Sequence, residues 1–278
     1  MSALAAQARD LVLTYGSTVA VARSSFTIPS GSVTAIIGPN GSGKSTVLSA
    51  IAGLVEPAAG SIEVPARRSG SHRLAYVLQT TKVNEALPVT VREVVTMGRY
   101  AAAGAYLRLN RADRDAVESA MERTGIGDLA SRHLHHLSGG QRQRVFVAQG
   151  LAQEHDLLLL DEPLTGIDLP TAQAIDAIIH DEITRGCTVV LTTHDLSEAR
   201  AADHVVLLSG AVIAAGDPEM VLTAAHIKAA YGPSLLHVDE GRVFLDDPAH
   251  QPVAGRHVHG ERTIHTESSP TDLHPDGR

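Results

Sequence analysis

The sequence predicts an α/β fold built on a mostly parallel β-sheet. Three short apolar runs, Val33–Ile37, Leu157–Leu160 and Thr188–Thr193, have the length and composition of strands that are buried on both faces. Segments that can form helices lie between these runs, and residues 11–15 and 25–28 alternate like antiparallel strands. We therefore expect a sheet covered by helices, together with a smaller antiparallel part near the N-terminus.

Glycine and proline define the expected helices. A helix is predicted from Lys44 to Ala52, with Gly53 as its stop, and Gly186 ends another over residues 171–185 in the same way. Two more amphipathic segments, at 90–100 and 111–124, lie between the first two apolar runs, and proline or glycine residues bound them. We interpret about 82–145 as a helical subdomain inserted into the sheet core.

The last part of the chain has a different character. Residues 233–247 include a segment, 236–245, that could form a β-hairpin turning at Glu240 and Gly241. Residues 248–278 are polar and rich in proline, so they bury too little apolar surface to order themselves. This tail carries His250, His257, His259, His265 and His274, and the pair at 257 and 259 could bind a metal ion.

Composition excludes several classes of protein. The chain has 278 residues, 44% of them apolar, which is enough for a large core. A net charge of −8 argues against binding nucleic acid through general electrostatics. Cys187 is the only cysteine and we interpret it as a small apolar residue that opens a strand, so no intrachain disulfide can form. There is no secretory signal and no apolar run long enough to cross a bilayer, so any membrane role would come through a partner.

The first apolar run leads into a phosphate-binding loop. The loop sequence is Gly38, Pro39, Asn40, Gly41, Ser42, Gly43, Lys44, Ser45 and Thr46. Its glycines allow a tight turn that points backbone N–H groups at phosphate oxygens, and the following helix contributes its positive N-terminal end. Lys44 supplies a charge for the β- and γ-phosphates, and Ser45 offers a hydroxyl to Mg²⁺. The motif predicts binding of a nucleoside triphosphate.

Polar residues also follow the other two apolar runs. Asp161 ends the leucine run and is expected to hold Mg²⁺, and Glu162 is then placed to orient or deprotonate an attacking water. His194 follows the third run. Because ligands bind beyond the carboxyl ends of parallel strands, one site can collect all of these side chains.

A second motif, Leu137-Ser-Gly-Gly-Gln141, has two interpretations. Ser138 and Gln141 have the spacing of an ordinary capping box that opens a helix. The capping box does not explain Gly139 and Gly140, which are unfavourable inside a helix and make sense if a phosphate approaches the backbone closely.

With both motifs present, residues 8–232 resemble the ATP-binding subunit of an ABC transporter, with a RecA-like P-loop NTPase core, an N-terminal antiparallel β-subdomain and an inserted helical subdomain. The resemblance implies ATP and Mg²⁺ as ligands and a homodimer that closes on two ATP molecules. It implies further contacts from the following residues: Tyr15 stacking on adenine, Gln79 touching Mg²⁺, His194 reaching the γ-phosphate, Asp168 in the loop between the two sites, and Ser138, Gly140 and Gln141 on the partner's γ-phosphate. It also implies transmembrane permease subunits, which would hold the chain at the cytoplasmic face of the membrane, and an extracellular substrate-binding protein.

The resemblance extends to a cargo class. Residues 87–100 and 160–168 are similar to those of bacterial zinc and manganese importers, although residues 87–100 are equally similar to siderophore and vitamin B12 importers. A soluble ABC ATPase that acts in DNA repair or translation is the remaining alternative, while the second motif excludes a small-molecule P-loop kinase. His133, His135 and His136, which precede that motif, are interpreted as solvated linker residues.

Overall fold

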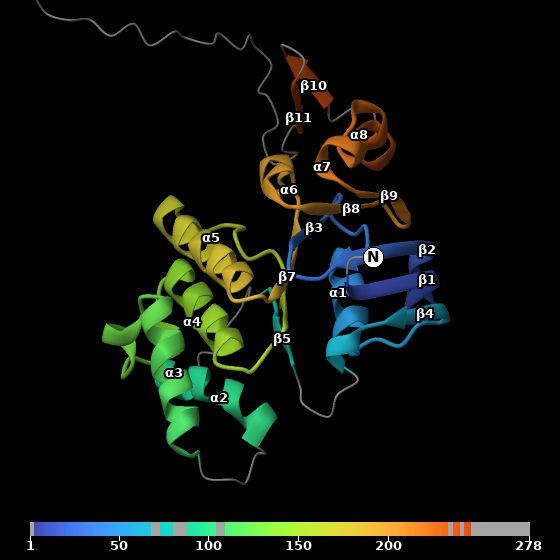
Figure 1. The fold of residues 1–278 in the computed structure, drawn as a ribbon. Helices are drawn as coiled ribbons and strands as arrows, with labels where there is room; N and C mark the ends of the chain where they lie inside the picture. The colour runs from blue at the N-terminus through green and yellow to red at the C-terminus, as the bar shows by residue number, and fades with distance from the viewer. Residues whose placement is uncertain are drawn as a thin grey trace, which may run out of the picture. The chain divides into compact units, whose positions relative to one another are not determined.

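Six strands form a central, mostly parallel sheet (Figure 1). Its order is β5-β6-β7-β3-β8-β9, and within this sheet β9 pairs with β8 in antiparallel fashion. The strands are β3 (Val33–Ile37), β5 (Leu74–Val77), β6 (Leu157–Leu160), β7 (Thr188–Thr193), β8 (His204–Leu208) and β9 (Val212–Gly216). The three apolar runs singled out from the sequence are β3, β6 and β7, with the predicted bounds.

The computed structural model describes residues 3–67, 73–79, 88–103, 109–232, 236–239 and 242–245, the last two ranges and residues 101–103 as backbone only. Residues 1–245 form one unit of the chain. The histidine-containing tail predicted at 248–278 lies outside the described residues.

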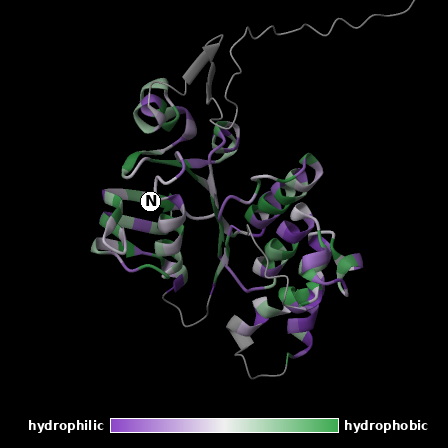
Figure 2. Ribbon diagram, turned by 180° about the vertical axis from the view of Figure 1, so that it is seen from behind, coloured by the Kyte–Doolittle hydropathy of each residue, from purple (hydrophilic) through white to green (hydrophobic). Residues whose placement is uncertain are grey.

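Alternate residues of the central strands belong to two different cores, because successive side chains of a strand point to opposite faces. Ala35, Leu158 and Val205 pack into the core on the side of the helices. Ile36 and Leu159 pack into the core on the side of the N-terminal sheet. Both faces are therefore covered, which explains why the runs are apolar throughout rather than alternating. Figure 2 shows hydrophobic residues along these strands.

The N-terminal part is a three-stranded antiparallel sheet of order β2-β1-β4, formed by β1 (Leu4–Tyr15), β2 (Thr18–Pro29) and β4 (Ala59–Glu63). β1 and β2 are longer than the segments 11–15 and 25–28 that the sequence predicts. Two features of β1 explain why its full length was not predicted. After Leu4, the start of β1 is rich in alanine, which is a poor strand former. Register shifts then interrupt its alternation, and Asp10 lies within them in the left-handed backbone region with φ of 49°.

Four helices lie on the opposite side of the central sheet from this small sheet (Figure 1). They are α2 (Val91–Ala103), α3 (Arg111–Arg123), α4 (Gly139–Leu151) and α5 (Leu169–Thr184). α4 continues past residue 145 because its end packs directly on the sheet, and a Cβ at Gly150 would lie 2.7 Å from a methyl of Val77. The boundary of the inserted subdomain at about 82–145 stays a prediction.

The remaining elements complete this unit. They are α1 (Lys44–Ala52), α6 (Leu196–Ala201), α7 (Pro218–Val221), α8 (Ala224–Tyr231), β10 (Leu236–Asp239) and β11 (Arg242–Leu245), with β10 and β11 paired antiparallel. α1 ends at Gly53 in the left-handed conformation, as the sequence predicts. Within the described part of the chain, none of the helices combines the length and apolar character that a bilayer-spanning segment needs.

Candidate nucleotide site

The candidate site lies at the carboxyl ends of four neighbouring strands. The sheet order places β5, β6, β7 and β3 side by side. Gln79 follows β5, Asp161 and Glu162 follow β6, His194 follows β7, and the glycine loop follows β3. Because these strands are parallel, the four segments leave the sheet at the same edge.

The glycine loop is packed tightly against its surroundings at two positions. A Cβ at Gly38 would lie 1.9 Å from the backbone oxygen of Leu208, so only glycine fits there. Gly43 has φ of 101°, and a Cβ on it would lie 2.6 Å from a methyl of Val21. These contacts fix the loop between β3 and α1, which leaves Asn40 and Gly41 exposed at its tip.

Lys44 is buried at the start of α1, with 6% of its side chain exposed. Its Nζ donates to the backbone oxygens of Gly38 at 2.9 Å and Pro39 at 3.2 Å, and lies 3.9 Å from Glu162 Oε1. Burial lowers the pKa of Lys44, and the carboxylates of Glu162 and Asp161 offset part of this shift.

Ser45 and Asp161 meet across the site. Ser45 Oγ donates to Asp161 Oδ1 at 3.1 Å, although the two residues lie 116 positions apart in the sequence. The same carboxylate oxygen accepts from the hydroxyl of Thr192 at 2.6 Å. Asp161 is buried, with 5% of its surface exposed, so these two hydroxyls fix the direction of its carboxylate.

Sequence reasoning missed Thr192. This residue lies inside β7, where its fully buried hydroxyl also accepts from the backbone N–H of Glu162 at 2.8 Å. The available signal was a threonine within a strand that is buried along its whole length, because a buried hydroxyl needs a partner. Nothing in the sequence alone pointed to Asp161 and Glu162 as those partners.

Glu162 has a constrained backbone and side chain. Its φ of 47° lies in the left-handed region, which costs a residue other than glycine roughly 1–3 kcal/mol and is concentrated at functional sites. Its Oε2 accepts from the side-chain amide of Gln79 at 2.8 Å. The structure therefore brings Lys44, Ser45, Gln79, Asp161 and Glu162 into one connected network.

Two predicted residues are not joined to this network. Tyr15 ends β1 with 81% of its surface exposed, and His194 is exposed after β7. Among the described residues, no hydrogen bond links either side chain to the glycine loop. Both remain available to a ligand, and their predicted contacts stay predictions.

The Leu137–Gln141 motif forms the capping box in full. Ser138 Oγ accepts from the backbone N–H of Gln141 at 3.3 Å, and Gln141 Oε1 accepts from the backbone N–H of Ser138 at 3.0 Å. A Cβ at Gly140 would lie 2.8 Å from Thr171 Oγ1, whereas Gly139 has open space around it. Close phosphate approach is therefore not needed to explain Gly140, because packing of α4 on α5 already requires a glycine there.

Asp168 is the N-cap of α5. Its Oδ1 accepts from the backbone N–H of Thr171 at 2.8 Å, and hydrogen bonds at Thr171 hold the pKa of Asp168 below its ordinary value. Thr171 therefore lies between the Asp168 loop and the helix that carries the second motif, a role that sequence reasoning did not identify.

The expectation of solvated linker residues is wrong for His133 and His135, each of which has a buried ring nitrogen, and it is confirmed for His136, which is exposed. The three rings cluster, with the centroids of His135 and His136 4.1 Å apart and those of His133 and His135 5.6 Å apart. Nδ1 of His133 and of His135 is buried without a hydrogen-bond partner among the described atoms. The short turn Leu134–His136 folds the segment back on itself because Leu134 is buried in the helical core.

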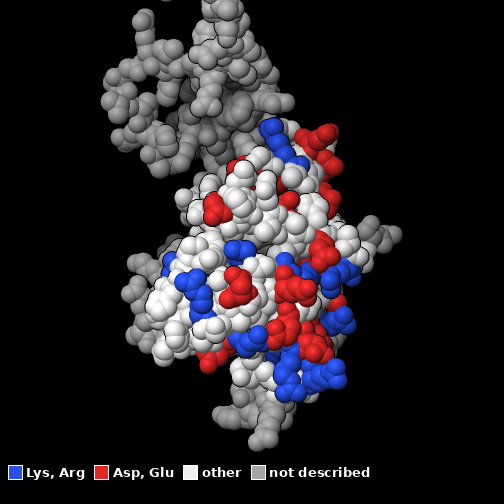
Figure 3. Space-filling view, turned by 90° about the vertical axis from the view of Figure 1, so that its left-hand side faces the viewer, with Lys and Arg blue, Asp and Glu red and all other residues white. Residues whose placement is uncertain are grey.

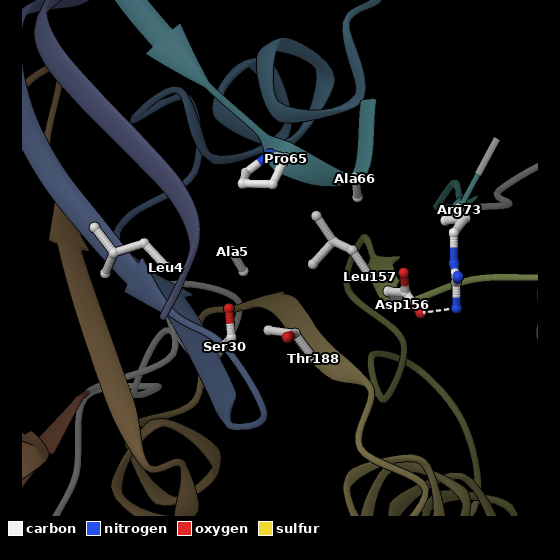
Figure 4. Close-up of a pocket in the computed structure, with 9 residues that line it drawn as sticks. All are labelled: Leu4, Ala5, Ser30, Pro65, Ala66, Arg73, Asp156, Leu157 and Thr188. Atoms are coloured by element: carbon white, nitrogen blue, oxygen red, sulfur yellow. Dashed lines mark hydrogen bonds and ion pairs between the residues drawn. The ribbon is translucent and has the colours of Figure 1, made fainter. Parts of the chain in front are cut away.

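A separate cavity lies at the opposite, amino end of the strands. It has a volume of about 290 Å³ and is shown in Figure 4. Its lining residues are Leu4, Ala5, Ser30, Pro65, Ala66, Arg73, Asp156, Leu157 and Thr188. Leu157 and Thr188 are the first residues of β6 and β7, whereas the candidate site lies beyond the last residues of the same strands. This cavity is therefore distinct from the nucleotide site.

The chain is similar to known transport ATPases. Residues 21–165 match the family model described as ABC transporter. The chain is 40% identical over 235 residues to the chelated iron transport system membrane protein YfeB of Yersinia pestis, covering 82% of this chain and 79% of YfeB. It is also 40% identical over 234 residues to the zinc transport system ATP-binding protein TroB of Treponema pallidum, covering 83% of this chain and 88% of TroB.

A solved structure has the same fold. The ATP-binding cassette MJ0796, in a dimeric post-hydrolysis state bound to ADP and Pi, superposes with a TM-score of 0.67 at 25% identity. The match covers 77% of this chain and 98% of that one. Given the glycine loop at the sheet edge, the second motif and these similarities, the chain belongs to the ABC transporter family, as an ATP-binding and ATP-hydrolysing subunit.

Proposed function

We propose that this chain dimerises on ATP and powers a membrane importer of a divalent metal ion such as zinc or manganese. The observation that carries the ATPase part is the network at the carboxyl edge of the sheet, where Lys44, Asp161 and Glu162 lie together. The cargo part rests on the transport systems named for the relatives.

The glycine loop and Lys44 would bind the triphosphate. Backbone N–H groups of the loop and the N-terminal end of α1 favour anionic oxygens, and the Lys44 ammonium would move from the carbonyls of Gly38 and Pro39 to phosphate. Burial makes this charge more effective, because few water dipoles screen it. Tyr15 would stack on the adenine with its exposed ring.

The residues around Ser45 fit Mg²⁺. The cation prefers oxygen ligands, and the hydroxyl of Ser45 and the carboxylate of Asp161 present oxygens 3.1 Å apart beside the loop. Gln79 would add its side-chain oxygen. When bound, Mg²⁺ neutralises charge on the phosphates.

Glu162 would act as the base for the attacking water. Its side chain is 13% exposed, and its carboxylate already lies within reach of Lys44 and Gln79. The strained backbone at this residue fixes the direction of the carboxylate, which favours a positioned catalytic group. His194 would contact the γ-phosphate from the end of β7.

The second motif would act on the nucleotide of a partner subunit. Ser138 is exposed and Gly139 has open space around it, so a phosphate can reach this helix start from outside. Ser138, Gly140 and Gln141 of one copy would then complete the site of the other, with Asp168 in the loop between the two sites. The dimeric state of the structurally similar cassette MJ0796 supports this arrangement.

The partners would be permease subunits and, beyond the membrane, a substrate-binding protein. Met97 and Tyr100 of α2 are 44% and 40% exposed, and this helix belongs to the layer through which we expect the permease to be contacted. The chain would thus lie at the cytoplasmic face of the membrane. A chelated-iron importer is the second candidate, because YfeB is named for such a system.

A soluble ABC ATPase that acts on nucleic acid is less well supported. On the face drawn in Figure 3, acidic and basic side chains are interspersed. A nucleic-acid backbone would instead require a continuous basic surface, and the net charge of the whole chain is −8.

Glu162→Gln tests the catalytic proposal. We expect turnover to be lost while ATP binding persists, because the amide keeps the shape of the side chain but cannot accept the proton. ATP should then trap a stable dimer, measured by size-exclusion chromatography with light scattering. Glu56→Gln, at an exposed position outside the network, is the matched control and should hydrolyse ATP normally. Normal hydrolysis by the Glu162 variant would refute the assignment.

The cargo is tested separately by tagging the chain in its own cell. Co-purification with a membrane permease, and loss of zinc or manganese accumulation in the Glu162→Gln strain, would support the metal importer. Loss of chelated-iron uptake alone would favour the second candidate, and co-purification with ribosomes or DNA would contradict both.

A further inference from the structure

Three potential metal ligands meet on the side of the molecule opposite the nucleotide site. His155 precedes β6, Cys187 precedes β7, and Glu182 lies in the last turn of α5. A ring nitrogen, the sulfur and a carboxylate oxygen of these residues all lie within 4.8 Å of one another. We propose that His155, Glu182 and Cys187 form a binding site for a zinc-type divalent cation. This site goes beyond the proposed function, because it shares no residue with the nucleotide network.

The chain turn after α5 builds one side of the site. Gly186 has φ of 84°, and the backbone N–H of Cys187 donates to the backbone oxygen of Glu182 at 3.0 Å. This turn brings the thiol beside the carboxylate although five positions separate them. The sulfur also lies 3.5 Å from the backbone oxygen of His155, so the two strand starts and the helix end converge.

The imidazole of His155 is oriented as a metal ligand. Its Nδ1 faces the backbone oxygen of Gln153 at 2.8 Å, and its Nε2 faces Glu182 Oε2 at 2.8 Å. A carbonyl oxygen only accepts, so Nδ1 carries a proton and Nε2 points at the carboxylate. Metal-binding histidines commonly donate their second N–H to a backbone carbonyl in this way. A cation can take the place of the proton between Nε2 and the carboxylate.

The environment suits a cation of borderline softness. The side chains of His155 and Glu182 are 5% and 2% exposed, so a bound ion would be largely shielded from water. Arg123 of α3 donates to the other oxygen of Glu182, which fixes the carboxylate and compensates its charge. Sulfur, nitrogen and oxygen together are a ligand set for Zn²⁺, with a fourth position left for water.

Modest movement is enough to close the site. Zn²⁺ binds sulfur at about 2.3 Å and nitrogen at about 2.0 Å, which places tetrahedral ligands within about 4 Å of each other. Atoms near the 4.8 Å limit need to approach by roughly 1 Å, whereas His155 Nε2 and Glu182 Oε2, which lie 2.8 Å apart, need to separate slightly.

Cobalt(II) offers a specific test, because Cys187 is the only cysteine in the chain. Added to the full-length protein under reducing conditions, Co²⁺ should produce a near-ultraviolet thiolate-to-cobalt charge-transfer band that saturates at one ion per chain. Added Zn²⁺ should displace Co²⁺ and so remove this band. Histidines of the C-terminal tail can bind Co²⁺ but cannot give a thiolate band, so the band reports Cys187 alone and the ions bound to it are counted from its intensity.

Variants assign the three ligands. Cys187→Ser should abolish the band, and His155→Ala should weaken Co²⁺ binding by about tenfold or more. His180→Ala is the matched control, since its side chain is 71% exposed on the same helix as Glu182, and it should leave the titration unchanged. Circular dichroism confirms that each variant is folded. Absence of a band in the wild-type protein at saturating Co²⁺, or an unchanged titration in folded His155→Ala, would overturn the proposal and leave a purely structural Arg123–Glu182–His155 network.

Discussion

At the scale of single residues, the site depends on Thr192 as much as on the charged groups. One hydroxyl donates to Asp161 Oδ1 and accepts from the backbone N–H of Glu162, at 2.6 and 2.8 Å. It therefore couples the direction of the predicted magnesium ligand to the strained backbone of the predicted base. Thr192 is fully buried and acts through Asp161 and Glu162, so it is a positioning residue.

Thr192→Val tests this role. The substitution keeps the side-chain shape but leaves a buried N–H without its acceptor, which costs about 1–3 kcal/mol of unfolding free energy. We expect kcat to fall more than the affinity for ATP, because in our proposal the loop and Lys44 bind most of the triphosphate. Thr192→Ser keeps the hydroxyl and should restore most of kcat. Urea unfolding and steady-state kinetics measure both effects, and a valine variant with wild-type kcat would contradict the role.

At the scale of elements, a buried ion pair links helices of the helical layer. Arg99 of α2 donates to Asp113 Oδ1 of α3 through Nε at 3.0 Å and Nη2 at 2.8 Å. Its Nη1 donates to the backbone oxygen of Ala152 at 2.9 Å, just after α4. Asp113 also completes the capping box with Asn110. Three helices thus depend on a single guanidinium group.

Arg99→Met should destabilise the layer strongly. Removing one partner of a buried pair leaves an uncompensated charge, at a cost of about 3–5 kcal/mol. Adding Asp113→Asn removes that charge and should recover part of the loss, which distinguishes the charge effect from lost packing. Denaturant unfolding of the single and double variants measures the difference. A double variant no more stable than Arg99→Met would contradict the explanation.

The ion pair of Arg99 and Asp113 also predicts that the free energy of unfolding depends on pH in the acidic range. Hydrogen bonds from the backbone of Asn110 and from Arg99 hold the pKa of Asp113 below its ordinary value of 3.8. Below that value the unfolded chain binds more protons than the folded one, so stability is lost as the pH falls toward the folded-state pKa. Above pH 3.8, the carboxylate of Asp113 makes its full contribution to the free energy of unfolding. Asp113→Asn should therefore show a shallower loss of unfolding free energy in this acidic range than the wild type, and equal slopes would refute the prediction.

At the scale of the whole molecule, the exposed second motif and the nucleotide network are expected to work only between two copies. The network of Lys44, Asp161 and Glu162 includes no residue of the Leu137–Gln141 motif among its hydrogen bonds. Ser138 instead lies exposed at the start of α4. A head-to-tail pair of subunits brings unlike surfaces together at both sites at once.

Complementation between inactive subunits tests this arrangement. Lys44→Ala and Ser138→Arg should each be inactive alone, because every dimer lacks either the lysine or the motif at both sites. In an equal mixture, half of the dimers combine the two variants and contain one intact site, so roughly a quarter of wild-type activity should return. Steady-state ATPase assays of the mixture measure this value. Activity of Ser138→Arg alone at the wild-type rate would contradict the composite site.

Much of the site could be read from the sequence because its parts are local. The glycine loop, the carboxylates after β6 and the histidine after β7 each follow an apolar run, and the parallel sheet brings such strand ends together. The partial burial of His133 and His135 was not predicted, because it follows from Leu134 and the helical core. The polarity of the neighbouring residues in the sequence does not predict such burial.

The fold class, the nucleotide chemistry and the family could all be predicted from local stretches of residues, because strand burial, the loop glycines and the second motif are encoded in consecutive positions. The contacts between distant side chains became visible in the folded chain alone. Thr192 reaches Asp161 across the sheet, Thr171 explains Gly140, and His155, Glu182 and Cys187 converge from three elements. Such contacts depend on sheet order and helix packing, which no single stretch of sequence contains.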